Sequence, residues 1–296
     1  MVLPKLPTGS YGTAMSIQRV GIVGSGIMGA GLAEVAARAG FTVIARSRTQ
    51  AAADDMIATI QRGLSKAVER GKLTADDQVA IIGRIQAVSE TAQLADCDLI
   101  IESVIENLEI KQRLFAELDA VAKPSALLAT NTSTLPVVQL AMATNRPTQV
   151  CGIHFFNPAP AMTLVELVRP LTASADTMDQ AKAFAVACGK DAVAVQDRAG
   201  FIVNALLFPY LNNAVRMLEC GTASMESIDT AMKGGCNFPM GPFALLDLVG
   251  LDTSVAILDA MYDEFRDANY AAMPTLRRMV AAGRLGRKSK LGFYSY

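Results

Sequence analysis

One histidine and one glutamate are the side chains of this sequence best suited to acid–base chemistry. His154, in GIHFFNP, is the single histidine of the 296-residue chain, and Glu166 follows 12 positions later in TLVELV. Histidine gains and loses a proton near neutral pH, and a carboxylate bound to one ring nitrogen leaves the other nitrogen to act as a base. The spacing permits such a pair, and a buried structural histidine is the alternative.

Two further polar residues lie beside apolar runs. Ser133, in TNTST, follows an apolar strand and falls at the rim of the expected sheet, where open α/β sheets bind their ligands. The alternative for Ser133 is a helix N-cap before LPVVQL, because serine accepts hydrogen bonds from the first amides of a helix. Asn204 lies within apolar GFIVNALL, where a buried amide needs partners, so it either makes a structural hydrogen bond or contacts a substrate.

A glycine-rich turn stands between an apolar run, RVGIV, and an alanine-rich helical stretch that ends at Gly40. In a strand–turn–helix unit, glycines at this spacing permit a tight turn, a close approach to a pyrophosphate, and close packing of helix on strand. The helix N-terminus also attracts phosphate. We therefore expect a dinucleotide site rather than a structural turn, formed by Gly24, Gly26, Ile27, Met28 and Gly29.

The position that holds the adenosine ribose in such sites lies about 20 residues beyond the glycines and is commonly acidic. Here it is Ser47, between Arg46 and Arg48. A guanidinium binds phosphate oxygens through charge-assisted hydrogen bonds, whereas a carboxylate repels them. The residues therefore favour a 2′-phosphate and NADP(H) over NAD(H). The alternative is that both arginines are surface charges and either cofactor is accepted.

The order of apolar runs predicts an α/β, Rossmann-like doubly wound parallel sheet followed by an all-helical C-terminal domain. The runs FTVIA, DLIIESV, ALLATNT, VCGIHFF and DAVAVQD read as strands, with helical stretches such as 49–70 and 76–85 among them. Continuous apolar strands belong to parallel sheets covered on both faces, and helical spacing prevails after Asp197. We expect a flexible arm over residues 1–17, a dinucleotide-binding domain over 18–198 and a helical domain over 199–296.

Composition excludes several classes of function. With 27 Lys and Arg against 28 Asp and Glu, no global field draws the chain to nucleic acid or to an anionic membrane. The apolar residues form no uninterrupted spanning segment, so no membrane helix is expected. The five cysteines are scattered and show no metal-ligand spacing, which predicts a reduced, cytoplasmic protein without a metal site.

Several blocks of sequence resemble one family when they are taken together. They are VGIVGSGIMGAGLAEVAARAG, IESVIENLEIKQRLF, ATNTSTLPV, GIHFFNPAPAMTLVELV, GFIVNALLFPYLNNAVRMLECG, PMGPFALLDLVGLD and GRKSKLGFYSY. The chain from about Gln18 onward resembles the L-3-hydroxyacyl-CoA dehydrogenases, closest to the bacterial 3-hydroxybutyryl-CoA type. This resemblance implies hydride transfer between C3 of an (S)-3-hydroxyacyl-CoA and a nicotinamide, in a homodimer joined through the C-terminal domain.

The resemblance also implies roles for residues in catalysis. His154 matches the general base, and Glu166 matches the carboxylate that orients the imidazole and stabilises its charged form. Ser133 and Asn204 match residues that hydrogen-bond the substrate oxygen in the cleft between the domains.

Further matches concern the cofactor and coenzyme A. Lys66 and Arg70 fall at positions that meet the CoA phosphates, although two basic residues four apart on a helix are otherwise typical of a solvated face. The matches to nicotinamide-nucleotide contacts are Glu106, Lys111, Asn157 and Lys288.

The sequence departs from the family pattern at one position, and two other functions are compatible with it. The family usually carries aspartate at the position of Ser47, so its loss puts NAD in doubt. Relatives of similar architecture act on sugar acids such as L-gulonate or on acyl-carrier-protein thioesters. A non-enzymatic nucleotide-binding protein is the second rival, and the intact set of Ser133, His154, Glu166 and Asn204 argues against it.

Overall fold

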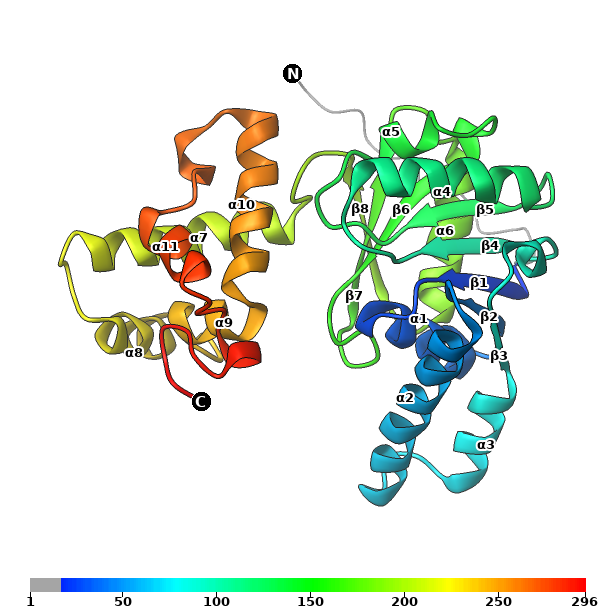
Figure 1. Ribbon diagram of the computed structural model, residues 1–296, viewed down its shortest axis with the longest axis horizontal. Helices are drawn as coiled ribbons and strands as arrows, with labels where there is room; N and C mark the ends of the chain where they lie inside the picture. The colour runs from blue at the N-terminus through cyan, green and yellow to red at the C-terminus, as the bar shows by residue number, and fades with distance from the viewer. Residues whose placement is uncertain (1–16) are drawn as a thin grey trace.

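The structure is a computed structural model that describes residues 17–296, and these form two domains lying side by side (Figure 1). The N-terminal domain is built on one large sheet, and the C-terminal domain consists of helices, as the sequence predicts. Residues 1–16, nearly all of the expected arm, lie outside the described residues. Ile17, the last residue of that expected arm, is buried in the core of the first domain.

The sheet has eight strands in the order β3-β2-β1-β4-β5-β6-β7-β8. All neighbours pair in parallel except β6 and β7, which are antiparallel, so the expected parallel sheet is confirmed with one reversal. The strands are β1 (Arg19–Val23), β2 (Thr42–Arg46), β3 (Ile85–Val88), β4 (Leu99–Glu102), β5 (Leu127–Thr130), β6 (Val150–Phe155), β7 (Leu164–Arg169) and β8 (Asp191–Gln196).

Helices cover both faces of the sheet. Side chains alternate between the faces along a strand, so Ile22 joins the apolar cluster under α1 and α6, whereas Val23 joins the cluster under α4 and α5. Helices α2 and α3 project away from the rest of the sheet (Figure 1). The helices are α1 (Ile27–Arg38), α2 (Gln50–Glu69), α3 (Ala75–Gly83), α4 (Leu108–Val121), α5 (Val137–Ala141) and α6 (Ala175–Ala187).

The second domain packs five helices around its own apolar core. Buried Asp247 accepts hydrogen bonds from the amides of Phe293 and Tyr294, which holds the C-terminal segment against the helices. Within residues 17–296, no helix combines the length and apolar character needed to cross a bilayer. The helices are α7 (Val203–Glu219), α8 (Met225–Cys236), α9 (Pro242–Val249), α10 (Leu251–Phe265) and α11 (Pro274–Ala281).

The link between the domains is tied to both of them. Asp197 accepts hydrogen bonds from the first amides of α5, and Glu264 of α10 accepts one from the Ala199 amide at 2.9 Å. Gly200 has φ +79°, and a Cβ there would lie 2.6 Å from the Met261 sulfur, so this position requires glycine. The chain direction from β8 into α7 is therefore fixed by local contacts.

Candidate active site

His154 and Glu166 face each other across the antiparallel pair β6–β7, where they are direct register partners. His154 Nδ1 lies 2.8 Å from Glu166 Oε2, and the two residues are only 6% and 1% exposed. The 12-residue spacing thus corresponds to one hairpin that brings the two side chains together. A carboxylate on Nδ1 fixes that nitrogen as the N–H donor, which leaves Nε2 as the proton acceptor.

The second oxygen of Glu166 serves the other domain. Oε1 accepts hydrogen bonds from the amides of Ile202 and Val203, each at 2.9 Å, at the start of α7. The first amides of a helix lack intrahelical partners, and the helix dipole favours a negative charge there. One buried carboxylate therefore joins the imidazole to the first helix of the C-terminal domain.

The imidazole is packed between aromatic rings but keeps one nitrogen without a partner. The ring centroid of His154 lies 4.5 Å from that of Phe156 and 5.4 Å from that of Phe201. Within the part of the chain that the structure describes, Nε2 makes no hydrogen bond. The pair is therefore oriented on one side and available for proton transfer on the other.

Asn204 is the second residue of α7, next to Val203 and its bond to Glu166. It is 8% exposed, and its side-chain amide has no hydrogen-bond partner among residues 17–296. The structural alternative for Asn204 thus finds no partner among the described residues. An amide that is nearly buried and has no protein partner is suited to receive a ligand atom.

Ser133 is half-buried in the loop after β5, and the N-cap alternative for it is wrong. Helix α5 begins after Pro136 without a side-chain cap from its own segment. Its first two amides, of Val137 and Val138, instead donate to Asp197 at 2.9 and 2.7 Å. Burial, although opposed by these two amides, raises the pKa of the Asp197 carboxyl. The Ser133 hydroxyl has no hydrogen-bond partner within residues 17–296.

The glycine turn fits a phosphate-bearing ligand. Gly24 has φ +122°, and a Cβ there would overlap the Ser103 carbonyl, while a Cβ at Gly29 would overlap Gly24. Gly26 differs, because a Cβ there would meet no protein atom within 4 Å. Glycine at this position therefore leaves open space in which a ligand can approach the backbone. Helix α1 begins directly after Gly26 without a side-chain cap, which leaves its first amides to bind an anion.

The two apolar residues of the turn, Ile27 and Met28, are the first two residues of α1. Ile27 is 77% exposed, whereas Met28 is partly buried against the core.

The end of β2 carries no acid. Ser47 is 5% exposed, and its hydroxyl lies 2.8 Å from the hydroxyl of Ser25 in the glycine turn. Arg46 Nε donates to the Ser89 carbonyl at 3.1 Å, and exposed Arg48 makes no ion pair within the described residues. The contact of Ser25 with Ser47 was not anticipated from the sequence, because it depends on how the turn folds over β2.

The four remaining nucleotide-site matches are not brought together as one group. Lys111 is 1% exposed and its ammonium binds Glu102 at 2.6 Å and Glu106 at 3.3 Å. Asn157 is exposed in the loop after β6. Lys288 belongs to the C-terminal domain, where it forms an ion pair with Asp252.

The candidate CoA residues lie at the far end of a protruding helix. Lys66 is in the last turn of α2 and Arg70 is the C-cap of this helix. Both are exposed, and neither forms an ion pair within residues 17–296. The structure does not bring them near His154 through any contact.

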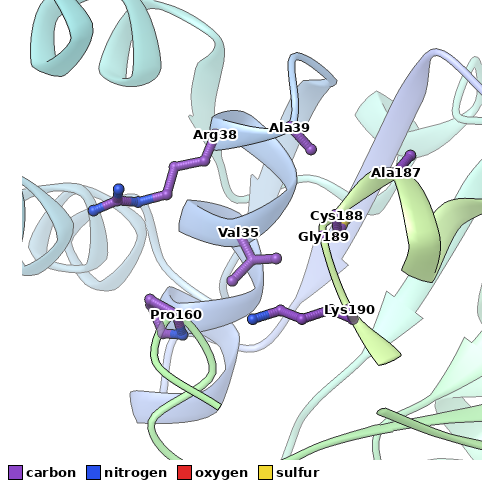
Figure 2. Close-up of a pocket in the computed structure, with 8 residues that line it drawn as sticks. All are labelled: Val35, Arg38, Ala39, Pro160, Ala187, Cys188, Gly189 and Lys190. Atoms are coloured by element: carbon purple, nitrogen blue, oxygen red, sulfur yellow. The ribbon is translucent and has the colours of Figure 1, made fainter. Parts of the chain in front are cut away.

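A surface hollow of about 240 Å³ between α1 and the α6–β8 turn is separate from these residues (Figure 2). Lys190 reaches across it and donates to the carbonyls of Ala159 and Met162 at 2.8 and 2.7 Å. Burial lowers the pKa of Lys190. None of the predicted site residues lines this hollow. Among residues 17–296, no group of three or more His, Cys, Asp or Glu is arranged to hold a metal ion.

Comparison with known proteins extends these observations over the whole described chain. The profile of the 3-hydroxyacyl-CoA dehydrogenase NAD-binding domain matches residues 19–198, and that of the C-terminal domain of the same enzymes matches residues 200–296. A 3-hydroxybutyryl-CoA dehydrogenase of Mycobacterium tuberculosis is 46% identical over 283 residues, which cover 95% of this chain and 99% of the relative.

Solved structures agree with the sequence comparison. FadB2 of M. tuberculosis superposes with a TM-score of 0.93 at 46% identity, covering 95% of this chain and 99% of that one. The (S)-3-hydroxybutyryl-CoA dehydrogenase PaaH1 of Ralstonia eutropha gives a TM-score of 0.92 at 40% identity, with the same coverage.

A glycine turn in a Rossmann-type sheet, joined through a buried His–Glu pair to a helical domain, defines a two-domain dinucleotide-dependent dehydrogenase. The chain belongs to the 3-hydroxyacyl-CoA dehydrogenase family. These relatives do not favour the rival sugar-acid or non-enzymatic interpretations.

Proposed function

We propose that the protein transfers hydride between C3 of an (S)-3-hydroxyacyl-CoA and a nicotinamide cofactor, with His154 as the general base. The observation that carries this proposal is the buried His154–Glu166 pair, in which Nε2 has no partner among residues 17–296. Because the M. tuberculosis and R. eutropha relatives are named for 3-hydroxybutyryl-CoA, we take a four-carbon acyl chain as the substrate.

The chemistry requires one proton acceptor. The bound nicotinamide supplies the hydride acceptor for oxidation and the hydride donor for reduction. As the alcohol becomes a ketone, its hydroxyl proton must leave, and Nε2 of His154 takes it. Glu166 then stabilises the imidazolium through the Nδ1–H bond. In the reverse direction the imidazolium returns the proton to the alkoxide oxygen.

Asn204 and Ser133 are proposed to bind the substrate oxygen. Each has a donor without a partner in the described chain. Donors aimed at the oxygen stabilise the charge that develops on it, and loss of one such donor costs about 10²–10³ in rate in well-studied sites. We assign both residues to holding the 3-oxygen against His154.

NADP(H) is proposed as the preferred cofactor. The family assignment supports a nicotinamide dinucleotide, and the residues at the end of β2 support the choice between the two forms. Ser47 replaces an acid, Ser25 holds its hydroxyl, and Arg48 has no competing carboxylate among the described residues. A phosphate on the ribose would be attracted by the guanidinium groups of Arg46 and Arg48, and Ser47 would not repel it as an acid would.

The protein is proposed to form a homodimer and to work in a reducing compartment, the cytoplasm. Apolar side chains on α7 and beside it are exposed: Leu206 is 72%, Met217 44% and Phe238 42% exposed. Apolar surface of this kind supports an interface. All five cysteines are unpaired, and Cys220 and Cys236 are exposed thiols, which supports a reducing environment.

The direct test is reduction of acetoacetyl-CoA with NADPH and NADH under identical conditions. We expect (S)-3-hydroxybutyryl-CoA as the product, and kcat/KM about tenfold or more higher with NADPH, since charge-assisted bonds to a 2′-phosphate are worth about 1.5–3 kcal/mol. Absence of activity on acetoacetyl-CoA together with oxidation of L-gulonate would replace the substrate class. Equal rates with both cofactors would remove only the NADP(H) preference.

A further inference from the structure

A buried ion pair lies at the carboxyl end of β4, outside the residues used so far in the proposed chemistry. Glu102 is 0% exposed and its Oε1 lies 2.6 Å from Nζ of Lys111, which is 1% exposed. Removing two charges from water costs free energy, and a pair of apolar residues of similar volume often stabilises a fold as much as a buried ion pair does. The pair is therefore poorly explained by stability alone.

The pair belongs to a closed ring of contacts among five residues. Lys111 binds both Glu102 and Glu106, and Glu106 Oε1 accepts a hydrogen bond from the Thr132 hydroxyl. On the other side, the Thr130 hydroxyl donates to Glu102 Oε2 at 2.8 Å and accepts from the Thr132 amide at 3.1 Å. The ring thus connects the ends of β4 and β5 with the start of α4, and the bond from Thr130 to Glu102 closes it.

The loop that carries Ser133 is attached to this ring at two points. Glu106 Oε1 accepts the Ser133 amide at 3.1 Å, and Thr132, the preceding residue, is itself a member of the ring. The Ser133 hydroxyl is left without a partner in the described chain. The ring therefore fixes the backbone around a hydroxyl that makes no bond of its own.

We propose that Glu102, Lys111 and Thr130 are positioning residues that set the Ser133 hydroxyl for the substrate oxygen. This inference rests on the proposed role of Ser133. Within the ring, three acceptors surround the Lys111 ammonium, which has three N–H donors. The acceptors are Glu102 at 2.6 Å, Glu106 at 3.3 Å and the Val104 carbonyl at 3.5 Å.

Thr130→Val tests the proposal with a small change. Thr130 is 0% exposed, and valine keeps its size while removing both ring bonds. We expect kcat/KM for acetoacetyl-CoA to fall about tenfold, because one buried hydrogen bond is worth about 1–2 kcal/mol, while cofactor affinity is unchanged. Thr130→Ser keeps the hydroxyl and should restore activity. The matched control is Thr177→Val, at a 2% exposed threonine whose hydroxyl also makes two bonds: it donates to the Thr148 carbonyl and accepts from the Ser174 hydroxyl. This control should leave activity unchanged.

A double-mutant cycle with Ser133→Ala decides the route of action. If the ring acts through Ser133, Thr130→Val should lower kcat/KM by less than about twofold once Ser133 is alanine. An equal loss in both backgrounds, an inactive Thr130→Ser, or full activity of Thr130→Val overturns the ring proposal alone. Full activity of Ser133→Ala overturns both the ring proposal and the proposed role of Ser133. It does not affect the proposed dehydrogenase function, which is tested by activity of the parent chain on acetoacetyl-CoA.

Discussion

At the scale of single residues, Glu166 has two tasks, one for each oxygen. Oε2 binds the imidazole of His154 and Oε1 binds the amides at the start of α7. A glutamine could serve one of these partners as an acceptor but would present an NH2 group to the other. The orientation of the imidazole and the position of the C-terminal domain thus depend on the same carboxylate.

The cofactor preference is a prediction about three neighbouring residues. Ser47→Asp combined with Arg46→Gln and Arg48→Gln places a carboxylate beside the ribose and removes both guanidinium groups. We expect the NADPH/NADH ratio of kcat/KM to fall by about a hundredfold, since charge-assisted bonds are lost and repulsion is added. The measurement is steady-state acetoacetyl-CoA reduction with each cofactor. An unchanged ratio would reject the 2′-phosphate argument.

The residues of the site could be predicted from the sequence more readily than the contacts between them. His154 and Glu166 could be selected by type and spacing, but their bond depends on β7 reversing direction beside β6. Ser25 and Glu102 were not selected, because a serine in a glycine turn and a glutamate at a strand end carry no signal of their own. Their partners, Ser47 and Lys111, are 22 and 9 residues away.

At the scale of elements, the strands with continuous apolar runs were predictable and two others were not. β3 (Ile85–Val88) and β7 (Leu164–Arg169) were not identified as strands. β3 follows α3 after a single residue, so its apolar side chains read as a continuation of the helix. β7 contains Glu166 at its centre, and burial of that charge is supported only by partners that the sequence does not reveal.

Helix α2 allows a prediction about coenzyme A. Lys66→Ala with Arg70→Ala should raise KM for acetoacetyl-CoA about fivefold and leave KM for the acetoacetyl-pantetheine thioester unchanged, because exposed charge pairs are worth at most about 1 kcal/mol. Steady-state kinetics with both thioesters measure this. Arg62→Ala, at an exposed position of the same helix, is the control. Equal effects on both thioesters would exclude a contact with the CoA phosphates.

At the scale of the whole molecule, the exposed apolar residues of the C-terminal domain predict self-association. Leu206→Glu should convert a dimer into a monomer, because it places a charge on the exposed apolar surface of α7, and should leave the fold intact since the side chain is 72% exposed. Light scattering after size exclusion measures the mass. Leu171→Glu, at a 95% exposed leucine of the first domain, is the control. A parent chain that is monomeric would contradict the dimer.

The two domains are joined by a short link whose contacts the sequence did not predict. A change from strands to helices near Asp197 was visible in the sequence, but the anchoring of Asp197 on α5 was not. Asp197, and not Ser133, therefore accepts the first amides of α5. The contact that joins the site to the second domain is a different one, from the amides of Ile202 and Val203 to Glu166 Oε1.

The central claim is that His154 transfers the proton while the cofactor is held elsewhere. The most direct measurement is kcat for acetoacetyl-CoA reduction and the dissociation constant of NADPH in His154→Gln, with thermal unfolding to verify the fold. We predict that kcat falls about 10²–10⁴-fold, the usual contribution of a general base or acid, while the dissociation constant changes by less than about twofold. A kcat close to that of the parent chain, or a parallel loss of cofactor affinity, would contradict the account.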